Sequence, residues 1–297
     1  MRREQGFALI LVIWSLILMT GIATGFSMSV RHENLSAQDA LQEMQFDADT
    51  ARALNYTAYR IAQRDPEERW INNGEWRLVP DSNDRIRVRM RAENSKVDLN
   101  RAPRELLEGL IGAVLPDAPA GELVDALIVW REGDERRVLD AAEQRERRAA
   151  GYRHLSANNA FQSVHQLGQV DGFDAQRAAR LKPYLTVHGL SPRINALGAD
   201  SVTLAAIPGL DALDAARFVE MRTEALANGR PVALDLLGEG RGFVEIRLDS
   251  KVISIDIEVS SQDGGNREEQ FVIRLHPDHH YEILARSSPV PRSEQAL

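Results

Sequence analysis

Cysteine is absent from the 297 residues of the chain, and its absence excludes several kinds of chemistry. Without cysteine there are no disulfides, no thiolate metal ligands and no cysteine nucleophile. A basic surplus is lacking too, because 36 Lys and Arg stand against 44 Asp and Glu, giving a formal net charge of -8. Binding to phosphate backbones depends on excess Lys and Arg, so nucleic acid and anionic lipid are not expected as main partners.

Sequence motifs typical of enzymes are also missing. No serine lies in a nucleophile elbow, and neither a phosphate-binding loop nor a pair of catalytic carboxylates is recognisable. The histidines lack metal-ligand spacing, and the adjacent His279 and His280 would point to opposite faces of a strand. We therefore expect no enzymatic activity, and no cofactor apart from the calcium ion considered below.

The chain does contain one long apolar run near its beginning. Residues 7–30 carry no charged side chain, and they follow a short leader that contains Arg2 and Arg3. At ~1.5 Å per residue, a helix over this run spans a hydrocarbon core of ~30 Å. The run is too long for the apolar part of a removable secretory signal, and Thr24-Gly25-Phe26 is a poor cleavage site. We predict a single transmembrane helix over 7–30 with a cytoplasmic amino terminus, because the basic residues precede it.

A second helical stretch follows the apolar run directly. Residues 31–63 contain no Gly or Pro, and their apolar residues recur mostly at spacings of three and four, until Asp65-Pro66 ends the pattern. One long helix over 7–64 is therefore predicted. A simple membrane anchor with a juxtamembrane helix is the plainer alternative.

The leader and the start of the run resemble the processing site of type IV pilins and type II secretion pseudopilins. Gly6 and Phe7 stand directly before the apolar residues, behind a basic leader. The resemblance implies that a prepilin peptidase cuts after Gly6 and methylates Phe7, and that the helix is kept for assembly. It also implies a bacterial inner-membrane location with a periplasmic C-terminal domain.

The fifth residue of the expected mature chain departs from the usual pattern. Most members of the family have Glu there, whereas this chain has Leu11. A carboxylate inside a bilayer costs ~2.5–3.5 kcal/mol on insertion scales, so it is useful only where it meets a partner. In the family that partner is the terminal amine of an adjacent subunit. The missing Glu is typical of type II secretion protein K, the large minor pseudopilin at the fibre tip.

Beyond the long helix, the sequence alternates between β and α patterns. Residues 85–91 alternate apolar side chains with four arginines, which we expect to form a solvated strand face and not an anion site, and 76–79 is expected to pair with this strand. Residues 252–260, 271–275 and 281–285 also read as strands. We predict an α+β pseudopilin fold with a long N-terminal transmembrane and amphipathic helix, a small antiparallel β-sheet and a large inserted all-α domain. The expected parts are the leader 1–6, the helix 7–64, the first β part 65–98, the helical insertion 99–237, the second β part 238–286 and the tail 287–297.

A weak internal repeat lies in the expected helical insertion. Residues 97–102 and 193–196 each precede a short helix that leads to a glycine turn, and 167–172 resembles a partial copy. These turns resemble helix-hairpin-helix units, which often bind DNA backbones. The turns here carry the acidic residues Asp171 and Asp211, so we favour a helical packing motif over a membrane-anchored DNA-binding protein.

The resemblance to protein K also raises the question of calcium. Members of that family often hold calcium in a loop that the segment 142–153 matches only in part. The candidate ligands are Asp134, Asp140 and Glu143. Five arginines between 136 and 148 oppose a bound cation, so a charged solvated helix remains the alternative.

Taken with these residues, the resemblance implies a minor pseudopilin at the tip of the type II secretion pseudopilus. Such a protein starts fibre assembly and supports the export of folded proteins across the outer membrane. The implied partners are the other minor pseudopilins, the major pseudopilin, the prepilin peptidase and the inner-membrane assembly platform, together with the secretin and secreted proteins. A minor pilin of a type IV pilus and a membrane-anchored DNA-binding protein are the alternatives.

Overall fold

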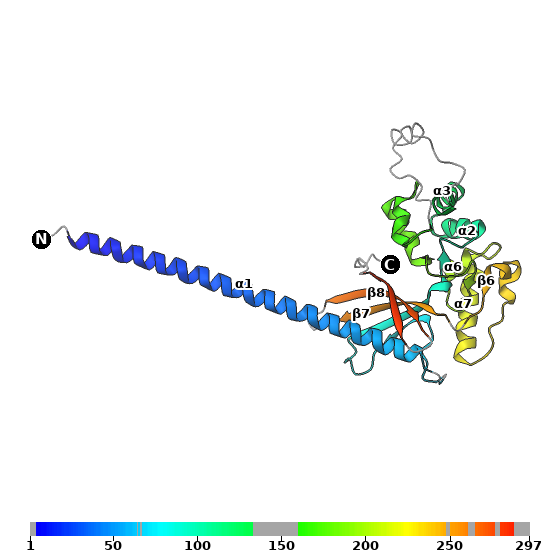
Figure 1. Cartoon of the computed structure of the whole chain (residues 1–297), viewed down its shortest axis with the longest axis horizontal. Helices are drawn as coiled ribbons and strands as arrows, with labels where there is room; N and C mark the ends of the chain where they lie inside the picture. Colours follow the sequence, from blue (N-terminus) through cyan, green and yellow to red (C-terminus); the bar gives the residue numbers. More distant parts are fainter. Residues whose placement is uncertain are drawn as a thin grey trace, which may run out of the picture. The chain divides into compact units, whose positions relative to one another are not determined.

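The structure is a computed structural model that describes residues 4–63, 65, 67–132, 160–247, 250–260, 265–276 and 280–287, without the side chains of 4–11, 23 and 25–35. The chain divides into two compact units, Met1–Leu54 and Asn55–Leu297. Helices and an antiparallel sheet are both present (Figure 1), so the predicted α+β class is confirmed.

The chain begins with one helix, α1, which runs from Glu4 to Ile61 over 58 residues. The helix begins at residue 4 instead of the predicted 7, and it ends at residue 61 instead of the predicted 64. Its last backbone bond joins the Ala62 N–H to the Ala58 carbonyl at 3.1 Å, and the Trp70 N–H then returns to the Arg60 carbonyl at 3.0 Å. This return contact satisfies a carbonyl that the end of the helix leaves without a partner.

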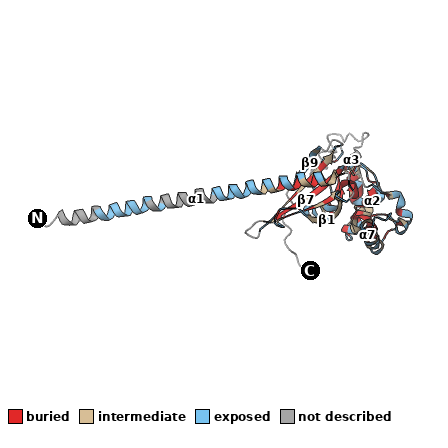
Figure 2. Cartoon of the chain, turned by 90° about the horizontal axis from the view of Figure 1, so that it is seen from below, coloured by how far each residue is buried: buried red, intermediate tan, exposed pale blue. Residues whose placement is uncertain are grey.

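The main sheet contains five antiparallel strands in the order β1-β2-β7-β8-β9, of which β7 and β8 are labelled in Figure 1. The strands are β1 (Asn73–Leu78), β2 (Ile86–Ala92), β7 (Val252–Ser260), β8 (Asn266–Leu275) and β9 (Tyr281–Ser287). Each strand predicted from alternation is present. The apolar side chains of β2, β7 and β8 are largely buried, as the red of β7 in Figure 2 shows, whereas Leu78 of β1 and Ile283 of β9 are about half exposed. Because β2 pairs directly with β7, the segment between them is an insertion into the sheet.

The insertion is built from short helices around one apolar core. The described elements are η1 (Glu93–Ser95), α2 (Arg104–Val114), α3 (Ala120–Glu132), η2 (Val164–Gln169), α5 (Ala175–Leu181), η3 (Lys182–Tyr184), α6 (Ser201–Ala205), α7 (Ala212–Ala227) and η4 (Asp235–Phe243). They bury Leu106, Leu107 and Phe218 almost completely. The helix expected over 140–150 lies outside the described residues.

Two short parallel strand pairs divide the insertion into two repeats. In the first repeat, β3 (Val97–Asp98) pairs with β4 (Leu185–Thr186); in the second, β5 (Ile194–Asn195) pairs with β6 (Val244–Glu245). The sequence did not predict these strands, because two residues are too few for a periodic pattern. The pairing of β6 extends the second repeat beyond residue 237, where the expected helical part ended.

Hydrogen bonds show that the two repeats begin in the same way. The Asp98 carboxylate accepts from the Asn100 N–H at 2.8 Å, and the Asn195 side chain accepts from the Leu197 N–H at 3.2 Å. An arginine from a later helix then donates to two carbonyls of each turn. The bonds run from Arg131 to Leu99 and Ala102 in the first repeat, and from Arg222 to Ala196 and Ala199 in the second. The segments 97–102 and 193–196, which the sequence suggested as repeats, thus share these hydrogen bonds.

Candidate functional site

The predicted processing site lies on the first turns of α1. Gly6, Phe7 and Leu11 belong to its helical backbone, but their side chains lie outside the described part of the structure. Cleavage after Gly6, methylation of Phe7 and the assembly role of Leu11 therefore remain predictions.

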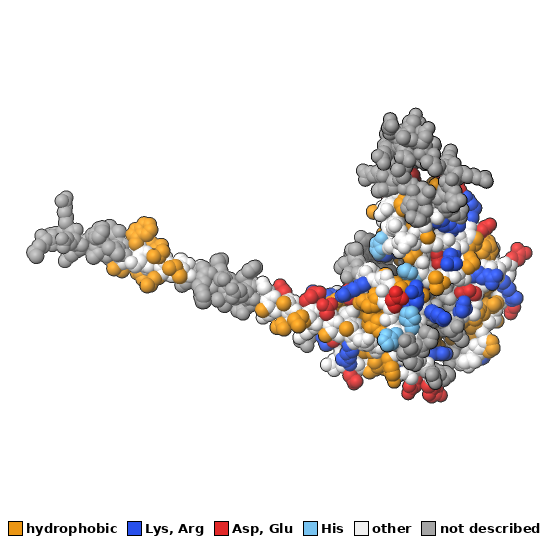
Figure 3. All heavy atoms as spheres, viewed as in Figure 1, with side chains coloured by type: hydrophobic (Ala, Val, Ile, Leu, Met, Phe, Trp, Pro, Cys, Tyr) orange, Lys and Arg blue, Asp and Glu red, His pale blue; other side chains and the backbone are white. Residues whose placement is uncertain are grey.

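The described side chains that follow are apolar and exposed. Between Val12 and Ile22, Trp14 is 69% exposed and Met19 is 71% exposed, and Figure 3 shows this apolar stretch on α1. The Thr20 and Thr24 hydroxyls donate back to the helix carbonyls of Leu16 and Thr20, each at 2.7 Å. Among the described residues, no helix combines the length and the hydropathy needed to cross a bilayer.

The structure does not test the candidate calcium site. Asp134, Asp140 and Glu143 all fall within 133–159, outside the described residues. Within the part of the chain that the structure describes, no group of three or more His, Asp or Glu side chains could hold a metal ion. Calcium binding accordingly remains a prediction.

The arginine face of β2 differs from the simple solvated face that we expected. Arg87 reaches both carboxylate oxygens of Glu258 at 2.8 Å, and Arg89 donates to Asp256 at 2.7 and 2.9 Å. Both guanidinium groups also lie over the Trp76 ring, 5.1 and 4.6 Å from its centroid. Because these two arginines are already paired with acids, they do not form an anion site.

The glycine turns have the backbone of hairpins but the charge of an acidic surface. Gly172 and Gly209 have φ of +84° and +81°, a region that glycine occupies without strain. Asp174 and Asp211 then cap the following helices by accepting backbone N–H bonds, each at 2.7 Å. Exposed carboxylates at these turns repel phosphate, so this surface does not suit a DNA backbone.

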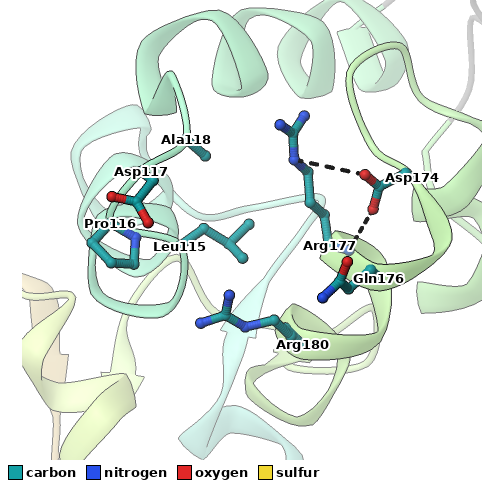
Figure 4. Close-up of a pocket in the computed structure, with 8 residues that line it drawn as sticks. All are labelled: Leu115, Pro116, Asp117, Ala118, Asp174, Gln176, Arg177 and Arg180. Carbon is teal, nitrogen blue, oxygen red and sulfur yellow. Dashed lines mark hydrogen bonds and ion pairs between the residues drawn. The ribbon is translucent and has the colours of Figure 1, made fainter.

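A small pocket of ≈ 240 Å³ lies beside the Asp174 cap, between the end of α2 and α5 (Figure 4). Its two arginines are engaged within the protein: Arg177 donates to the Gly172 carbonyl at 2.6 Å, and Arg180 donates to the Val114 carbonyl. Arg177 also lies 4.0 Å from the Asp174 carboxylate. These contacts fix α5 against α2 and favour a packing role for the pocket over a catalytic one.

Sequence reasoning missed a buried polar cluster where the sheet meets the repeats. Glu93 is 2% exposed and accepts from Lys96 Nζ at 2.5 Å and from the Thr186 hydroxyl. Asn94 beside it donates to Glu245 at 3.0 Å. The cluster thereby joins η1 to β4 of the first repeat and β6 of the second. Its only sequence signal is the Glu93–Lys96 pair at the end of a strand.

Comparisons with known proteins agree with this arrangement. Residues 92–189 match the family model described as Type II secretion system (T2SS), protein K. No curated protein matches the chain. A chain in the crystal structure of the GspK-GspI-GspJ complex from the enterotoxigenic Escherichia coli Type 2 Secretion System has a similar fold, with a TM-score of 0.55 and 18% identity. The similarity covers 87% of this chain and 99% of the solved one.

Proposed function

We propose that this chain is a type II secretion system protein K, a minor pseudopilin, and that it forms the tip of the pseudopilus. The observation that carries the proposal is the family match over 92–189, which covers the first repeat of the insertion. The fold shared with the solved complex over 87% of the chain supports it. At the tip, the protein would start fibre assembly and support the export of folded proteins across the outer membrane.

We also propose that the N-terminal part of α1 is a processed membrane helix. The support is the uncharged run 7–30 behind a basic leader, with Gly6 and Phe7 at its start. Leu11 in place of Glu suits a subunit that has no neighbour on that side to neutralise. The protein would then be a single-pass protein of the bacterial inner membrane, with a cytoplasmic amino terminus and a periplasmic C-terminal domain.

The proposed role is structural, and its partners are other proteins. The solved relative forms a complex of GspK, GspI and GspJ, so we propose other minor pseudopilins as direct partners of this chain. The major pseudopilin, the prepilin peptidase and the inner-membrane assembly platform would be further partners, as would the secretin and secreted proteins. The acidic hairpin turns argue against the DNA-binding alternative.

Calcium is a separate proposal. Asp134, Asp140 and Glu143 supply the carboxylate oxygens that calcium prefers, although several arginines lie among them in the sequence. Calorimetric titration of the purified full-length protein with calcium tests it. Absence of calcium uptake would remove this site without affecting the assembly proposal.

Deletion of the gene in the native host tests the proposed function. We expect proteins normally secreted through this system to accumulate in the periplasm, and the full-length chain to restore their export when it is supplied again. Chemical cross-linking in the complemented strain should recover pseudopilins that carry the membrane Glu. Normal secretion combined with loss of surface pili or of DNA uptake would instead support one of the alternatives.

A further inference from the structure

A groove lies between the C-terminal end of α1 and the start of β9, within the unit Asn55–Leu297. Its volume is ≈ 690 Å³, which is enough for more than one side chain. The residues that form it include Asn55, Ala58, Tyr59, Ala62, Asp65 and Tyr281. Two small alanines therefore leave room beside two tyrosines, an amide and a carboxylate.

The groove is lined by one carboxylate, two tyrosines and the uncharged amides of Asn55 and Gln63. Tyr59 is 59% exposed. Tyr281 donates its hydroxyl to Asn55 Oδ1 at 2.8 Å, and burial raises the pKa of this phenol, which therefore stays neutral. The Asp65 carboxylate accepts the Glu67 N–H at 2.9 Å, and no ion pair joins it to another described residue. The described lining thus presents negative charge and aromatic faces without a cation.

Other aromatic rings of the same unit already carry arginines. The pairs are Arg60 and Arg77 on Trp70, Arg87 and Arg89 on Trp76, and Arg286 on Phe271, at 4.6–5.9 Å from the ring centroids. Within the described residues, no Arg or Lys lies over Tyr59 or Tyr281. Stacking of a guanidinium on a ring is therefore a recurrent contact of this unit that the groove leaves unfilled.

We infer that the groove binds an arginine side chain presented by a partner protein, with the guanidinium over Tyr59 and paired with Asp65. Arginine fits better than lysine, because its planar group can stack on a ring and pair with a carboxylate at the same time. Tyrosine and arginine are also the residues that dominate binding energy at protein interfaces. The inference goes beyond the proposed function, because it does not depend on the system in which the protein acts.

Nuclear magnetic resonance of the full-length protein in detergent micelles tests this site. The chain has five tyrosines, so ring-labelled tyrosine gives few signals, and Tyr184 in the insertion serves as an internal reference. The probe is N-acetyl-arginine N-methylamide, and its neutral analogue N-acetyl-citrulline N-methylamide is the matched control. We expect the arginine probe to shift the Tyr59 and Tyr281 signals, with a dissociation constant on the order of 1–10 mM, and the citrulline probe to leave them in place.

Two exposed substitutions sharpen the test without disturbing the core. Asp65→Asn should weaken the arginine probe about two- to fivefold, the range expected for one exposed ion pair. Tyr59→Leu should remove the response of the Tyr281 signal to arginine. Equal shifts with citrulline, shifts of Tyr184 of the same size, or no shift with arginine would each overturn the inference.

Discussion

Arg222 is the clearest single residue on which the second repeat depends. The residue is 5% exposed, and its guanidinium donates to the carbonyls of Ala196 and Ala199 at 2.6 and 2.7 Å. Burial lowers its pKa to about 10, so the group is still charged at neutral pH. We expect Arg222→Leu to lower the free energy of unfolding by about 2–4 kcal/mol, because two buried carbonyls lose their donor.

Urea unfolding of the full-length protein, followed by circular dichroism, measures this loss. Arg217→Leu is the matched control, since Arg217 lies on the same helix and pairs only at the surface with Asp214. The control should change stability by less than about 0.5 kcal/mol. Equal effects of the two substitutions would contradict a structural role for the buried guanidinium.

Asp98 has the position in the first repeat that Asn195 has in the second, and its carboxylate makes the first repeat sensitive to pH. Its carboxylate accepts from Asn100 and, at 3.1 Å, from the N–H of Leu190, whose φ is +60°. Burial raises the pKa of Asp98 in the folded protein, despite these hydrogen bonds. The stability that this group contributes is therefore fully present below its unfolded pKa and is lost as the pH rises through the folded value.

The substitution Asp98→Asn tests the direction of this pH dependence of stability. The substitution keeps one acceptor but leaves one N–H without a partner, so we expect a loss of about 1 kcal/mol at pH 7. The stability difference between wild type and variant should grow as the pH falls from 7 towards the ordinary carboxylate pKa of ~3.9, because only the wild type gains by binding the proton. Urea midpoints at several pH values measure this difference. A difference that stays constant or shrinks towards low pH would contradict it.

At the scale of elements, contact between α2 and α6 depends on one glycine. A Cβ added to Gly109 would overlap the backbone carbonyl oxygen of Ala206, which cannot turn away as a side chain would. Gly112 lies one turn further along α2, and a Cβ there meets nothing. Substitutions at these two positions therefore distinguish the effect of helix propensity on stability from the effect of packing between α2 and α6.

We expect opposite results from alanine at these two glycines. Gly109→Ala should lower the free energy of unfolding by about 1–3 kcal/mol or more, since α2 must move away from α6. Gly112→Ala should be neutral or stabilise the protein by up to about 1 kcal/mol, because alanine favours helix. Thermal unfolding of the two variants beside the wild type compares them directly. Stabilisation by Gly109→Ala would show that the helices are not so closely packed.

Elements with a strong periodic pattern could be predicted from the sequence, whereas those defined by pairing alone could not. The alternation of β2 and β7 and the three-to-four spacing in α1 gave their types and approximate bounds. The strands β3 to β6 have two residues each. They form only where the start of a repeat lies beside its end, β3 with β4 and β5 with β6. The bulges in β1 and β9, the two edge strands of the sheet, were equally invisible, although such bulges hinder pairing with other chains.

The candidate sites likewise differ in how far apart their residues lie in the sequence. Gly6 and Phe7 are adjacent in sequence, so a local pattern was enough to predict a processing site. The groove joins Asn55 to Tyr281 across 226 positions, and the polar cluster joins Glu93 to Thr186 across 93. Such distant pairs depend on strand order and on the insertion, which no single segment of the sequence specifies.

The covalent state of the mature chain is the test that concerns the whole molecule. We expect the intact mass of the membrane-bound protein to correspond to a chain that starts at N-methylated Phe7. The reason is that a basic leader and Gly6 precede an uncharged run long enough to hold the cleavage site at the cytoplasmic membrane surface. The same protein from a strain without the prepilin peptidase is the control and should retain Met1. A wild-type chain that keeps Met1, or one that begins near Gly25, would contradict processing as a pseudopilin and favour a plain anchor or a secretory signal.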